Sequence, residues 1–391
     1  MQQNEMQKLR KLASSIPKQK NLTIFFGRAG SHFMDNVKYF FLHCVKNQPE
    51  LECHFMAFDK KEADILREQG LPATWVNHPE SADLMAKTGI VVSDDFSWKD
   101  QDFLWALLSS AKTVQLWHGI PLKAIGFPEI NSTVNMTPEK AEHLSFAYSG
   151  YDAVVSTSPF FTEKAFGQAF KAKEFIESGY PRNDIFKRRP TKLDMINTDR
   201  DLYGELVKFR KMGGKVIFFM PTFRDTGGGP FEDGAIDMMR MSEFCKKNNL
   251  MFVCKFHPYL TLGNVTLPDN IRLVDSKSDA YPLLPLCDLL LTDYSSVYFD
   301  FLLVDNPMVF YPYDYEQYIS KNRELLFDYD SMTPGKKVMT EAELYTAFED
   351  IMLKNIDDFV DVRQKLRDLS FSNADGKAAK RLGEHIVSNY L

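Results

Sequence analysis

Four short polar clusters follow apolar, strand-like runs of this 391-residue sequence. They are Gln115–Lys123, Pro221–Asp225, Lys255–Pro258 and Thr292–Ser296, which read QLWHGIPLK, PTFRD, KFHP and TDYSS. Side chains at the carboxyl ends of strands are where open α/β sheets bind their ligands. The four clusters therefore contain most of the candidate functional residues of the chain.

The cluster Asp293-Tyr294-Ser295-Ser296 joins an apolar strand to a helical pattern. A helix start leaves backbone N–H groups without partners, and serine is a favoured N-cap whose hydroxyl adds a further donor. Such a turn suits an anion, and phosphate above all. The alternative is a plain capped helix. Asp293 either braces the turn or contacts the ligand.

Two clusters of the second half contain cationic side chains. His257 follows a strand directly and precedes a proline that ends strand pairing. Lys255 alternates with His257, so both side chains face one side of the strand and can meet one phosphate group. Arg224 lies beyond the predicted strand end at Pro221, beside Thr222. Together they predict a pocket for a diphosphate; singly, Arg224 suits a surface ion pair and His257 a hydrogen-bonded core position.

In the first half, His118 comes after the strand TVQLW and before Gly119, which permits a tight turn. The unperturbed pKa of histidine lies near physiological pH, so an imidazole here suits a general base. The structural alternative is a histidine packed beside a buried tryptophan. Lys123 adds positive charge nearby. Arg182, in the turn GYPRND, contacts either a phosphate or a carboxylate.

The histidines and the five cysteines show no metal-ligand spacing, and no CxxC pair occurs. We therefore expect neither a metal nor an organic cofactor. Cys254 and Cys287 lie in apolar runs. Free, buried thiols in a reducing cytoplasm are their expected state.

The composition excludes several classes of protein. The formal net charge of −6 argues against a nucleic-acid partner, and the apolar fraction of 44% is typical of a globular protein. No apolar run approaches the roughly 20 residues of a membrane span. The N-terminal segment also lacks the apolar core of a signal peptide. We expect a cytoplasmic protein that at most touches the cytoplasmic face of a membrane peripherally.

Strand-like and helical patterns alternate in two series that position these clusters. Residues 21–27 predict a strand and 33–47 the helix after it; residues 213–225 and 233–249 repeat this order in the second series. Near-continuous apolar strands are what a parallel sheet covered on both faces requires. The pattern predicts an α/β fold with two doubly wound, Rossmann-like domains facing across a cleft.

The ordered motifs together resemble the CDP-glycerol glycerophosphotransferase family, which includes teichoic acid primases and polymerases and capsule polymer transferases. They extend from Gln115 to Tyr318 and read QLWHGIPLKAIGF, GYPRND, MPTFRDT, KFHP and DLLLTDYSSVYFDFLLVDNPMVFYPYDYEQY. GSHFMDNVKYF is a looser match to the family's N-terminal motif. The sequence departs from the family at Ile120, usually threonine, and at Phe223, commonly tryptophan. Neither departure removes a titrating group.

The resemblance implies a GT-B architecture and a metal-independent transfer of glycerol phosphate from CDP-glycerol to a hydroxyl, with release of CMP. It implies an acceptor-side domain at residues 1–190 and a CDP-glycerol-binding domain at 191–356. We expect helices at 357–391 to pack back toward the first domain. The implied acceptor is a lipid-linked or capsular polymer.

The implied site assigns catalytic roles to His118 and His257. The substrate-binding candidates are Lys123, Arg182, Thr222, Arg224, Lys255, Asp293, Ser295 and Ser296. Two other enzymes would suit the same architecture: a glycosyltransferase with another nucleotide-activated donor, and a ribitol-phosphate transferase. A non-catalytic homologue that serves as a scaffold in envelope assembly is the alternative of another class.

Overall fold

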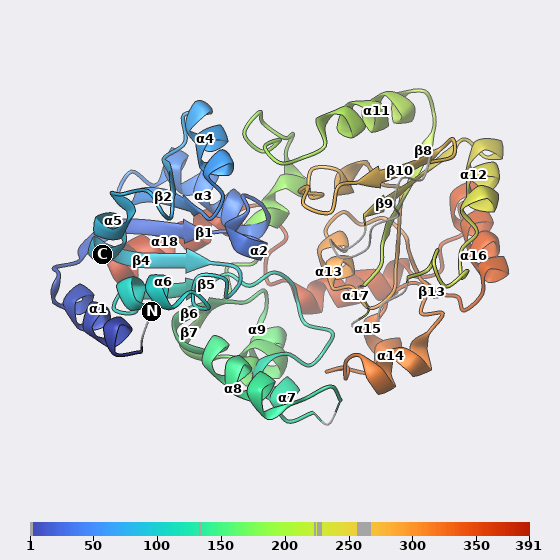
Figure 1. The fold of residues 1–391 in the computed structure, drawn as a ribbon. Coiled ribbons are helices and arrows are strands. Elements are labelled where there is room, and N and C mark those ends of the chain that lie inside the picture. Colours follow the sequence, from blue (N-terminus) through green and yellow to red (C-terminus); the bar gives the residue numbers. More distant parts are fainter. Residues whose placement is uncertain (1–2, 133, 223, 225–228, 256–266) are drawn as a thin grey trace. The chain divides into compact units, whose positions relative to one another are not determined.

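The computed structural model of the chain describes residues 3–132, 134–222, 224, 229–255 and 267–391 (Figure 1). The residues form two compact units. Unit 1 consists of Met1–His118, Pro138–Ile196 and Phe371–Leu391, and unit 2 of Gly119–Thr137 and Asn197–Ser370. Both units are discontinuous in sequence.

Unit 1 is built on a parallel sheet. Within the described residues this sheet has seven strands in the order β3-β2-β1-β4-β5-β6-β7, and all neighbours are parallel. The strands are β1 (Gln19–Phe26), β2 (Glu52–Ala57), β3 (Ala73–Trp75), β4 (Thr88–Ser93), β5 (Lys112–Gln115), β6 (Ser149–Val155) and β7 (Lys171–Ile176). Every residue of β4 is buried, as expected for a central strand that helices cover on both faces.

The helices of unit 1 follow the strands in sequence. They are α1 (Gln3–Ser15), α2 (Arg28–Ser31), α3 (Asp35–Asn47), α4 (Lys60–Glu68), α5 (Ser81–Lys87), α6 (Asp102–Leu108), α8 (Pro138–Ala147), α9 (Pro159–Phe161), η1 (Thr162–Phe166), α10 (Gly167–Ala169), η2 (Pro181–Lys187) and α18 (Ala378–Tyr390). Helix α18 packs on α3, and its Gly383 lies close to the side chain of Gln48: a Cβ there would lie 2.7 Å from Gln48 Nε2. The N-terminal and C-terminal parts of the sequence thus belong to the same unit.

Unit 2 contains a second parallel sheet. Among the described residues it has six strands in the order β10-β9-β8-β11-β12-β13, again with parallel neighbours. The strands are β8 (Lys215–Met220), β9 (Leu250–Lys255), β10 (Ile271–Val274), β11 (Leu289–Thr292), β12 (Met308–Phe310) and β13 (Lys336–Lys337). A buried cluster of aliphatic and aromatic side chains from these strands and from α12 (Met238–Lys247) and α16 (Glu341–Phe348) forms its core.

The helices of unit 2 are mostly short. They are α7 (Gly126–Ile130), α11 (Arg200–Lys211), α12 (Met238–Lys247), η3 (Leu284–Leu286), α13 (Val297–Phe301), α14 (Tyr315–Lys321), α15 (Tyr329–Met332), α16 (Glu341–Phe348), η4 (Glu349–Leu353) and α17 (Val360–Ser370). The helix predicted at 233–249 begins later, at Met238, because the Asp237 side chain caps it by accepting from the N–H groups of Met239 and Arg240.

The strand orders create one topological switch point in each sheet. In unit 1 the order reverses between β1 and β4, and in unit 2 between β8 and β11. Ligands of open α/β sheets bind outside the carboxyl ends of the strands at such points. The segments after Phe26, Ser93, Met220 and Thr292 are therefore the positions to inspect for function.

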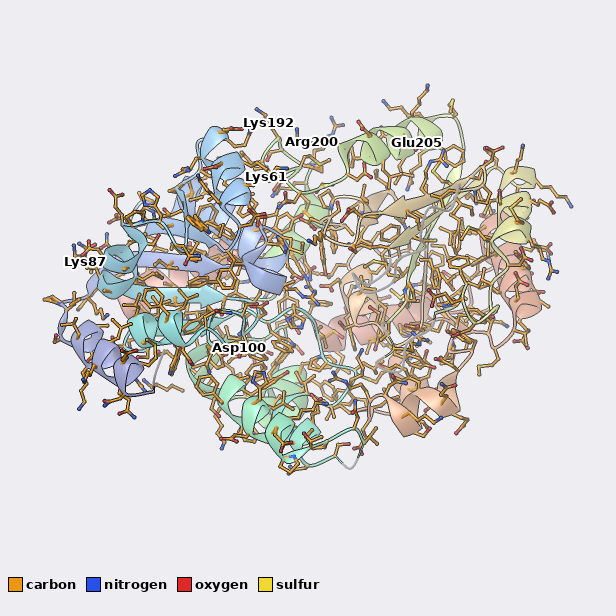
Figure 2. All side chains as sticks on the ribbon, viewed as in Figure 1. Lys61, Lys87, Asp100, Lys192, Arg200 and Glu205 are labelled. Carbon is orange, nitrogen blue, oxygen red and sulfur yellow. The ribbon has the colours of Figure 1, made fainter. Side chains whose placement is uncertain are left out.

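The remaining sequence expectations concern the surface and the cysteines. Charged side chains such as Lys61, Lys192 and Arg200 are exposed on the outside of the ribbon (Figure 2). All five cysteines are free and buried, as expected. In the part of the chain that the structure describes, none of the helices has the length and apolar character needed to cross a bilayer.

Candidate functional site

The turn after β5 carries His118, and side chains distant in sequence hold it. Trp117 has a φ of 57°, in the left-handed region that a bulky residue rarely adopts. Gln115 Oε1 accepts from Trp117 N at 2.9 Å, and Asn36 Nδ2 donates to Trp117 O at 2.8 Å. Arg182 Nη1 donates to His118 O at 2.9 Å. These three contacts stabilise the unusual backbone and fix where His118 lies.

The imidazole of His118 has a defined tautomer. Its Nδ1 lies 2.8 Å from the carbonyl oxygen of Asp94, which directly follows β4. A carbonyl can only accept, so Nδ1 carries the proton and Nε2 presents its lone pair. Burial, and after it the positive charge of Arg28, lower the pKa of His118 to about 3. The half-buried ring is therefore neutral at pH 7 and able to accept a proton.

His118 also packs beside a buried tryptophan, as in the structural alternative considered for it. Trp117 is buried, and the two ring centroids lie 3.9 Å apart. This close, tilted contact limits rotation of the imidazole without using either ring nitrogen. Packing beside tryptophan and presenting Nε2 are thus compatible properties of one side chain.

Asp35 forms ion pairs with two arginines. Its Oδ1 lies 2.5 Å from Nη1 of Arg182, which is 1% exposed, and its Oδ2 lies 3.2 Å from Nη1 of Arg28. Burial alone would raise the pKa of Asp35, but the charges of Arg182 and Arg28 outweigh it and lower the pKa. Of the two contacts expected for Arg182, the structure therefore shows the carboxylate.

Asp94 is a buried carboxyl group beside this network. Val37 N donates to Asp94 Oδ2 at 3.1 Å, and within the described residues Oδ1 has no hydrogen-bond partner. Burial, followed by the charges of Asp35 and Asp95, raises the pKa of Asp94 well above its usual range. Asp35, not Asp94, makes the ion pairs with Arg182 and Arg28.

In unit 2, Asp293 braces the turn that carries the two serines. Its Oδ1 accepts from Thr222 N at 2.8 Å and from Tyr294 N at 2.5 Å. Its Oδ2 lies 2.5 Å from Nη1 of Arg224. The contacts join the ends of β8 and β11 at the switch point. Of the two roles proposed for Asp293, the brace is seen; a contact with a ligand stays a prediction.

Arg224 is enclosed by carboxylates and aromatic rings. Its side chain is 3% exposed, and its Nε and Nη2 each lie 2.9 Å from an oxygen of Asp314. Its guanidinium carbon lies 5.3 Å from the ring centroid of Tyr294 and 5.5 Å from that of Tyr318. Burial lowers the pKa of Arg224, but Asp293 and Asp314 more than offset it and raise the pKa. The predicted phosphate contact of Arg224 stays a prediction, since these carboxylates occupy its guanidinium.

Ser295 and Ser296 follow the braced turn and are half-buried. Ser296 is the residue before the five-residue helix α13, but its side chain does not cap the helix. Neither hydroxyl makes a hydrogen bond to any residue that the structure describes. The plain capped helix is therefore not what forms, and both hydroxyls can donate to a ligand.

The remaining cationic candidates differ in what can be said of them. Lys255 ends β9, and its Nζ donates to the carbonyls of Asp275 at 3.0 Å and Ser276 at 2.7 Å. His257 lies outside the described residues. The predicted pairing of Lys255 and His257 on one phosphate therefore stays a prediction.

Lys123 and Thr222 are the remaining substrate-binding candidates, and both lie in unit 2. Lys123 forms an antiparallel bridge with Leu325. Thr222 directly follows Pro221 after β8, and its buried Oγ1 has no hydrogen-bond partner among the described residues.

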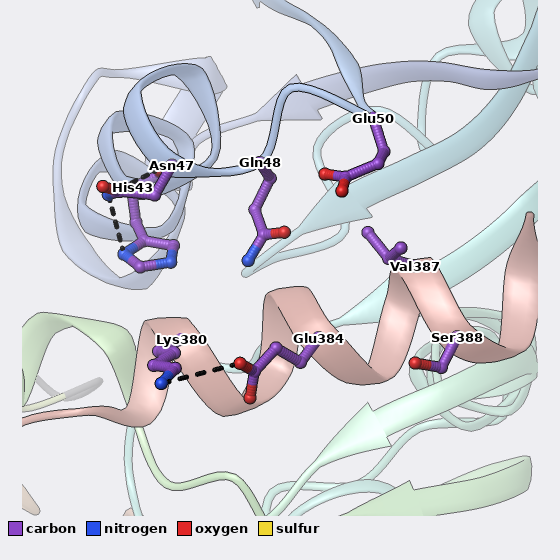
Figure 3. Close-up of a pocket in the computed structure, with 8 residues that line it drawn as sticks. All are labelled: His43, Asn47, Gln48, Glu50, Lys380, Glu384, Val387 and Ser388. Atoms are coloured by element: carbon purple, nitrogen blue, oxygen red, sulfur yellow. Dashed lines mark hydrogen bonds and ion pairs between the residues drawn. The ribbon is translucent and has the colours of Figure 1, made fainter.

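A separate hollow of about 460 Å³ lies between α3 and α18 in unit 1 (Figure 3). Its lining side chains carry both signs of charge, and Lys380 Nζ lies 3.6 Å from Glu384 Oε1. Its lining residues are His43, Asn47, Gln48, Glu50, Lys380, Glu384, Val387 and Ser388. It contains none of the candidate residues and lies away from the switch point of the sheet.

The sequence interpretation missed the residues that hold the candidates in place. Asp35 and Asn36 hold the His118 turn, and Asp314 holds Arg224. Two features of the sequence could have pointed to such residues. Asp94, whose carbonyl accepts from His118, stands directly after an apolar strand, and Asp314 lies within the longest motif. Neither signal names a partner, because the paired residues are far apart in sequence.

Comparison with known proteins identifies the relatives of the chain. The sequence model of the family described as CDP-glycerol:poly(glycerophosphate) glycerophosphotransferase matches residues 8–388. The chain is 29% identical over 354 residues to the teichoic acid poly(glycerol phosphate) polymerase of Bacillus subtilis, covering 87% of this chain and 45% of that protein. It is 28% identical over 317 residues to the teichoic acid ribitol-phosphate polymerase TarL of Staphylococcus aureus, covering 78% and 52%.

The chain thus spans about half the length of these polymerases. A third relative is nearer in length: the teichoic acid glycerol-phosphate transferase of Staphylococcus aureus is 26% identical over 393 residues, which cover 96% of this chain and 95% of that protein.

Solved structures establish the fold. The wall teichoic acid polymerase TagF superposes with a TM-score of 0.75 at 22% identity, over 99% of this chain and 94% of that one. A glycosyltransferase of kitacinnamycin matches with a TM-score of 0.54 at 11% identity, over 95% and 99%. The two parallel-sheet α/β units therefore belong to the GT-B architecture, and the predicted fold class is confirmed.

Proposed function

The chain belongs to the CDP-glycerol:poly(glycerophosphate) glycerophosphotransferase family, and from this we propose that it transfers glycerol phosphate from CDP-glycerol to a hydroxyl of a teichoic-acid-type or capsular polymer, releasing CMP. The observation that carries the proposal is the oriented, neutral imidazole of His118 at the strand ends of unit 1. A reaction that must take a proton from an alcohol needs such a group.

In the proposed reaction the acceptor oxygen attacks the phosphorus that bears glycerol. An O–P bond forms, the P–O bond to CMP breaks, and CMP leaves with the electron pair. Nε2 of His118 takes the proton of the acceptor hydroxyl, while Nδ1 keeps its hydrogen bond to the Asp94 carbonyl. The pKa of about 3 describes the protein without substrate. An anionic diphosphate raises the pKa of a nearby imidazole and so strengthens the base when substrate is bound.

The donor phosphates are assigned to unit 2. We propose that the free hydroxyls of Ser295 and Ser296 donate to phosphate oxygens, with Thr222 beside them. Positive charge would come from His257 and Lys255, and also from Lys123. Asp293 and Arg224 keep the turn rigid, which matters because preorganised donors stabilise charge without reorganising. The proposed transfer uses these groups in place of a metal.

Transfer of ribitol phosphate is the second candidate. Relatives support it, because the chain is 28% identical to a ribitol-phosphate polymerase and 29% identical to a glycerol-phosphate polymerase. The two donors share the cytidine diphosphate and differ only in the polyol. The serine turn and His118 serve both equally.

Nucleotide release from CDP-glycerol, CDP-ribitol and UDP-sugars, with mass spectrometry of the products, tests the proposal. We expect CMP release and a product heavier than the acceptor by one glycerol phosphate, unchanged by a metal chelator. A mass gain of ribitol phosphate supports the second candidate, and UDP release supports a glycosyltransferase. No release with any donor and acceptor would contradict an enzymatic role and favour a scaffold. Co-sedimentation with vesicles separately tests the proposed peripheral contact with a membrane.

A further inference from the structure

Arg28 is a half-exposed cation at the switch point of unit 1 that the proposed chemistry does not yet use. It follows β1 after Gly27, and its side chain is 39% exposed. Nη1 lies 3.2 Å from Asp35 Oδ2. Within the described part of the chain, the other N–H groups of this guanidinium make no hydrogen bond. Arg28 therefore has donors to offer a ligand.

The loop that carries Arg28 has a fixed backbone. A Cβ on Gly27 would lie 1.9 Å from the carbonyl oxygen of His32, so the loop closes tightly at this glycine. Ala29 has a φ of 55°, and its N–H donates to Asp95 Oδ2 at 2.6 Å. A fixed loop presents the arginine at a lower entropic cost of binding than a mobile one would.

A short chain of contacts connects Arg28 to the proposed base. Asp35 lies between Arg28 and Arg182, and Arg182 donates to His118 O at 2.9 Å. Among the charged groups, Arg28 has the largest effect on the pKa of His118, and only burial lowers this pKa more. The half-exposed guanidinium is therefore connected to the backbone of His118 through two side chains of unit 1.

Two guanidiniums and several acidic side chains lie around this point of unit 1. Arg28 and Arg182 face the single carboxylate of Asp35. Burial, followed by the charges of Asp35 and Asp95, raises the pKa of Asp94 well above its usual range. Asp95 is the other acidic group close to Arg28, and it accepts the N–H of Ala29. Arg182 is buried and cannot reach a substrate, so Arg28 is the member of the pair that an anion can approach.

We propose that Arg28 binds a phosphodiester of the acceptor, next to the hydroxyl that His118 deprotonates. This inference rests on the proposed function, because a polyol-phosphate chain carries a phosphodiester beside its terminal unit. The planar guanidinium fork matches two phosphate oxygens, which a lysine cannot do as well. The subsite would select acceptors that already bear a phosphodiester over neutral glycosides.

The ratio of kcat/KM for two acceptors tests the inference. One acceptor is a glycerol phosphate dimer and the other a neutral glycerol glycoside of similar length. We expect Arg28→Gln to lower the ratio about 10- to 100-fold, the range for a lost hydrogen bond to a charged group. Arg28→Lys should recover part of the ratio. Any effect through the pKa of His118 acts on both acceptors and cancels.

The matched control is Arg67→Gln. Arg67 lies in α4 of the same unit, is half-exposed and pairs with one carboxylate, that of Asp64. We expect it to leave the ratio unchanged. An unchanged ratio in Arg28→Gln, or an equal fall in both variants, would overturn the inference.

Calorimetric titration with the glycerol phosphate dimer keeps the test independent of turnover. We expect Arg28→Gln to weaken binding by about the same 10- to 100-fold and to reduce its dependence on salt. Should the wild type transfer nothing, the proposed function fails, while this titration still decides the role of Arg28. Equal affinity in wild type and Arg28→Gln would contradict the subsite. Circular dichroism confirms that each variant is folded.

Discussion

The two units hold their candidate residues with the same kind of contact but with opposite charge balance. In unit 1 one carboxylate, that of Asp35, meets the guanidiniums of Arg182 and Arg28. In unit 2 one guanidinium, that of Arg224, meets two carboxylates. Both arrangements lie at the switch point of a parallel sheet, where ligands of open α/β sheets bind.

The difference determines which polar groups each unit can offer to a ligand. The Arg224 cluster is closed, so unit 2 offers the hydroxyls of Ser295 and Ser296 on a rigid turn. The Asp35 cluster is open on one side, because Arg28 is half in solvent. Unit 1 thus combines the neutral imidazole of His118 with an accessible cation, which suits the acceptor that we propose, an alcohol that is also an anion.

Removing the closed guanidinium should have the largest effect on stability. Arg224→Met leaves the carboxylates of Asp293 and Asp314 without their buried partner, and we expect a loss of about 3–5 kcal/mol in the free energy of unfolding. Hydrogen exchange of the β11 amides in urea reports this for unit 2 alone.

The control for this prediction is Arg240→Met in the same unit. Arg240 pairs with Glu341 at 2.9 Å but is 65% exposed, so its loss should change stability by at most about 1 kcal/mol. If Arg224→Met is no worse than Arg240→Met, the closed cluster does not stabilise unit 2 as described.

Breaking the open cluster should cost less stability but more activity. Asp35→Asn keeps the shape of the side chain and removes its charge. Arg182 loses its buried partner, and we expect a loss of about 1–3 kcal/mol because Arg28 is already solvated. Turnover should fall about tenfold or more, since a positioning contact of a catalytic group is disturbed. Denaturation and steady-state kinetics measure the two effects.

Asp64→Asn is the matched surface control, because Asp64 pairs with Arg67 on the exposed face of α4. We expect Asp64→Asn to change neither the free energy of unfolding nor the turnover. A variant Asp35→Asn with wild-type turnover would show that the ion pair does not position His118.

The smallest expected effect concerns pH. The folded pKa of His118, about 3, lies below the ordinary value, so the ring stays unprotonated as pH falls through 6.5. The stability that the neutral ring contributes is complete above the unfolded pKa and is lost as pH falls toward 3. An NMR titration of the ring, assigned by its absence in His118→Gln, should show no midpoint between pH 5 and 8. A midpoint near 6.5 would contradict the described burial and charges.

Local contacts could be predicted from the sequence, and distant ones could not. The spacing of three residues between Thr340 and Glu343 predicts a capping box, and both of its hydrogen bonds form. Helix α18, by contrast, begins against the carboxylate of Asp184, which accepts from Ala378 and Ala379 N–H groups far along the chain. No pattern in the sequence near either segment indicates that cap.

The same distinction between local and distant contacts applies to the candidate site. The rule that function lies at strand ends led to His118, Asp293 and the two serines, because parallel strands bring their carboxyl ends to one edge of a sheet. The partners that fix them, such as Asp35 for Arg182, lie more than a hundred residues away. Only the folded chain pairs them, so the predicted phosphate contact of Arg182 could not be told from a carboxylate contact beforehand.

The central claim is that His118 acts on the acceptor alcohol and does not hold the donor. Its most direct test compares turnover and CDP-glycerol affinity in wild type and His118→Ala. General base catalysis contributes about 10²- to 10⁴-fold, so turnover should fall by at least that range while the Kd for CDP-glycerol changes by no more than about twofold. Near-wild-type turnover, or a loss of donor affinity as large as the loss of turnover, would contradict the account.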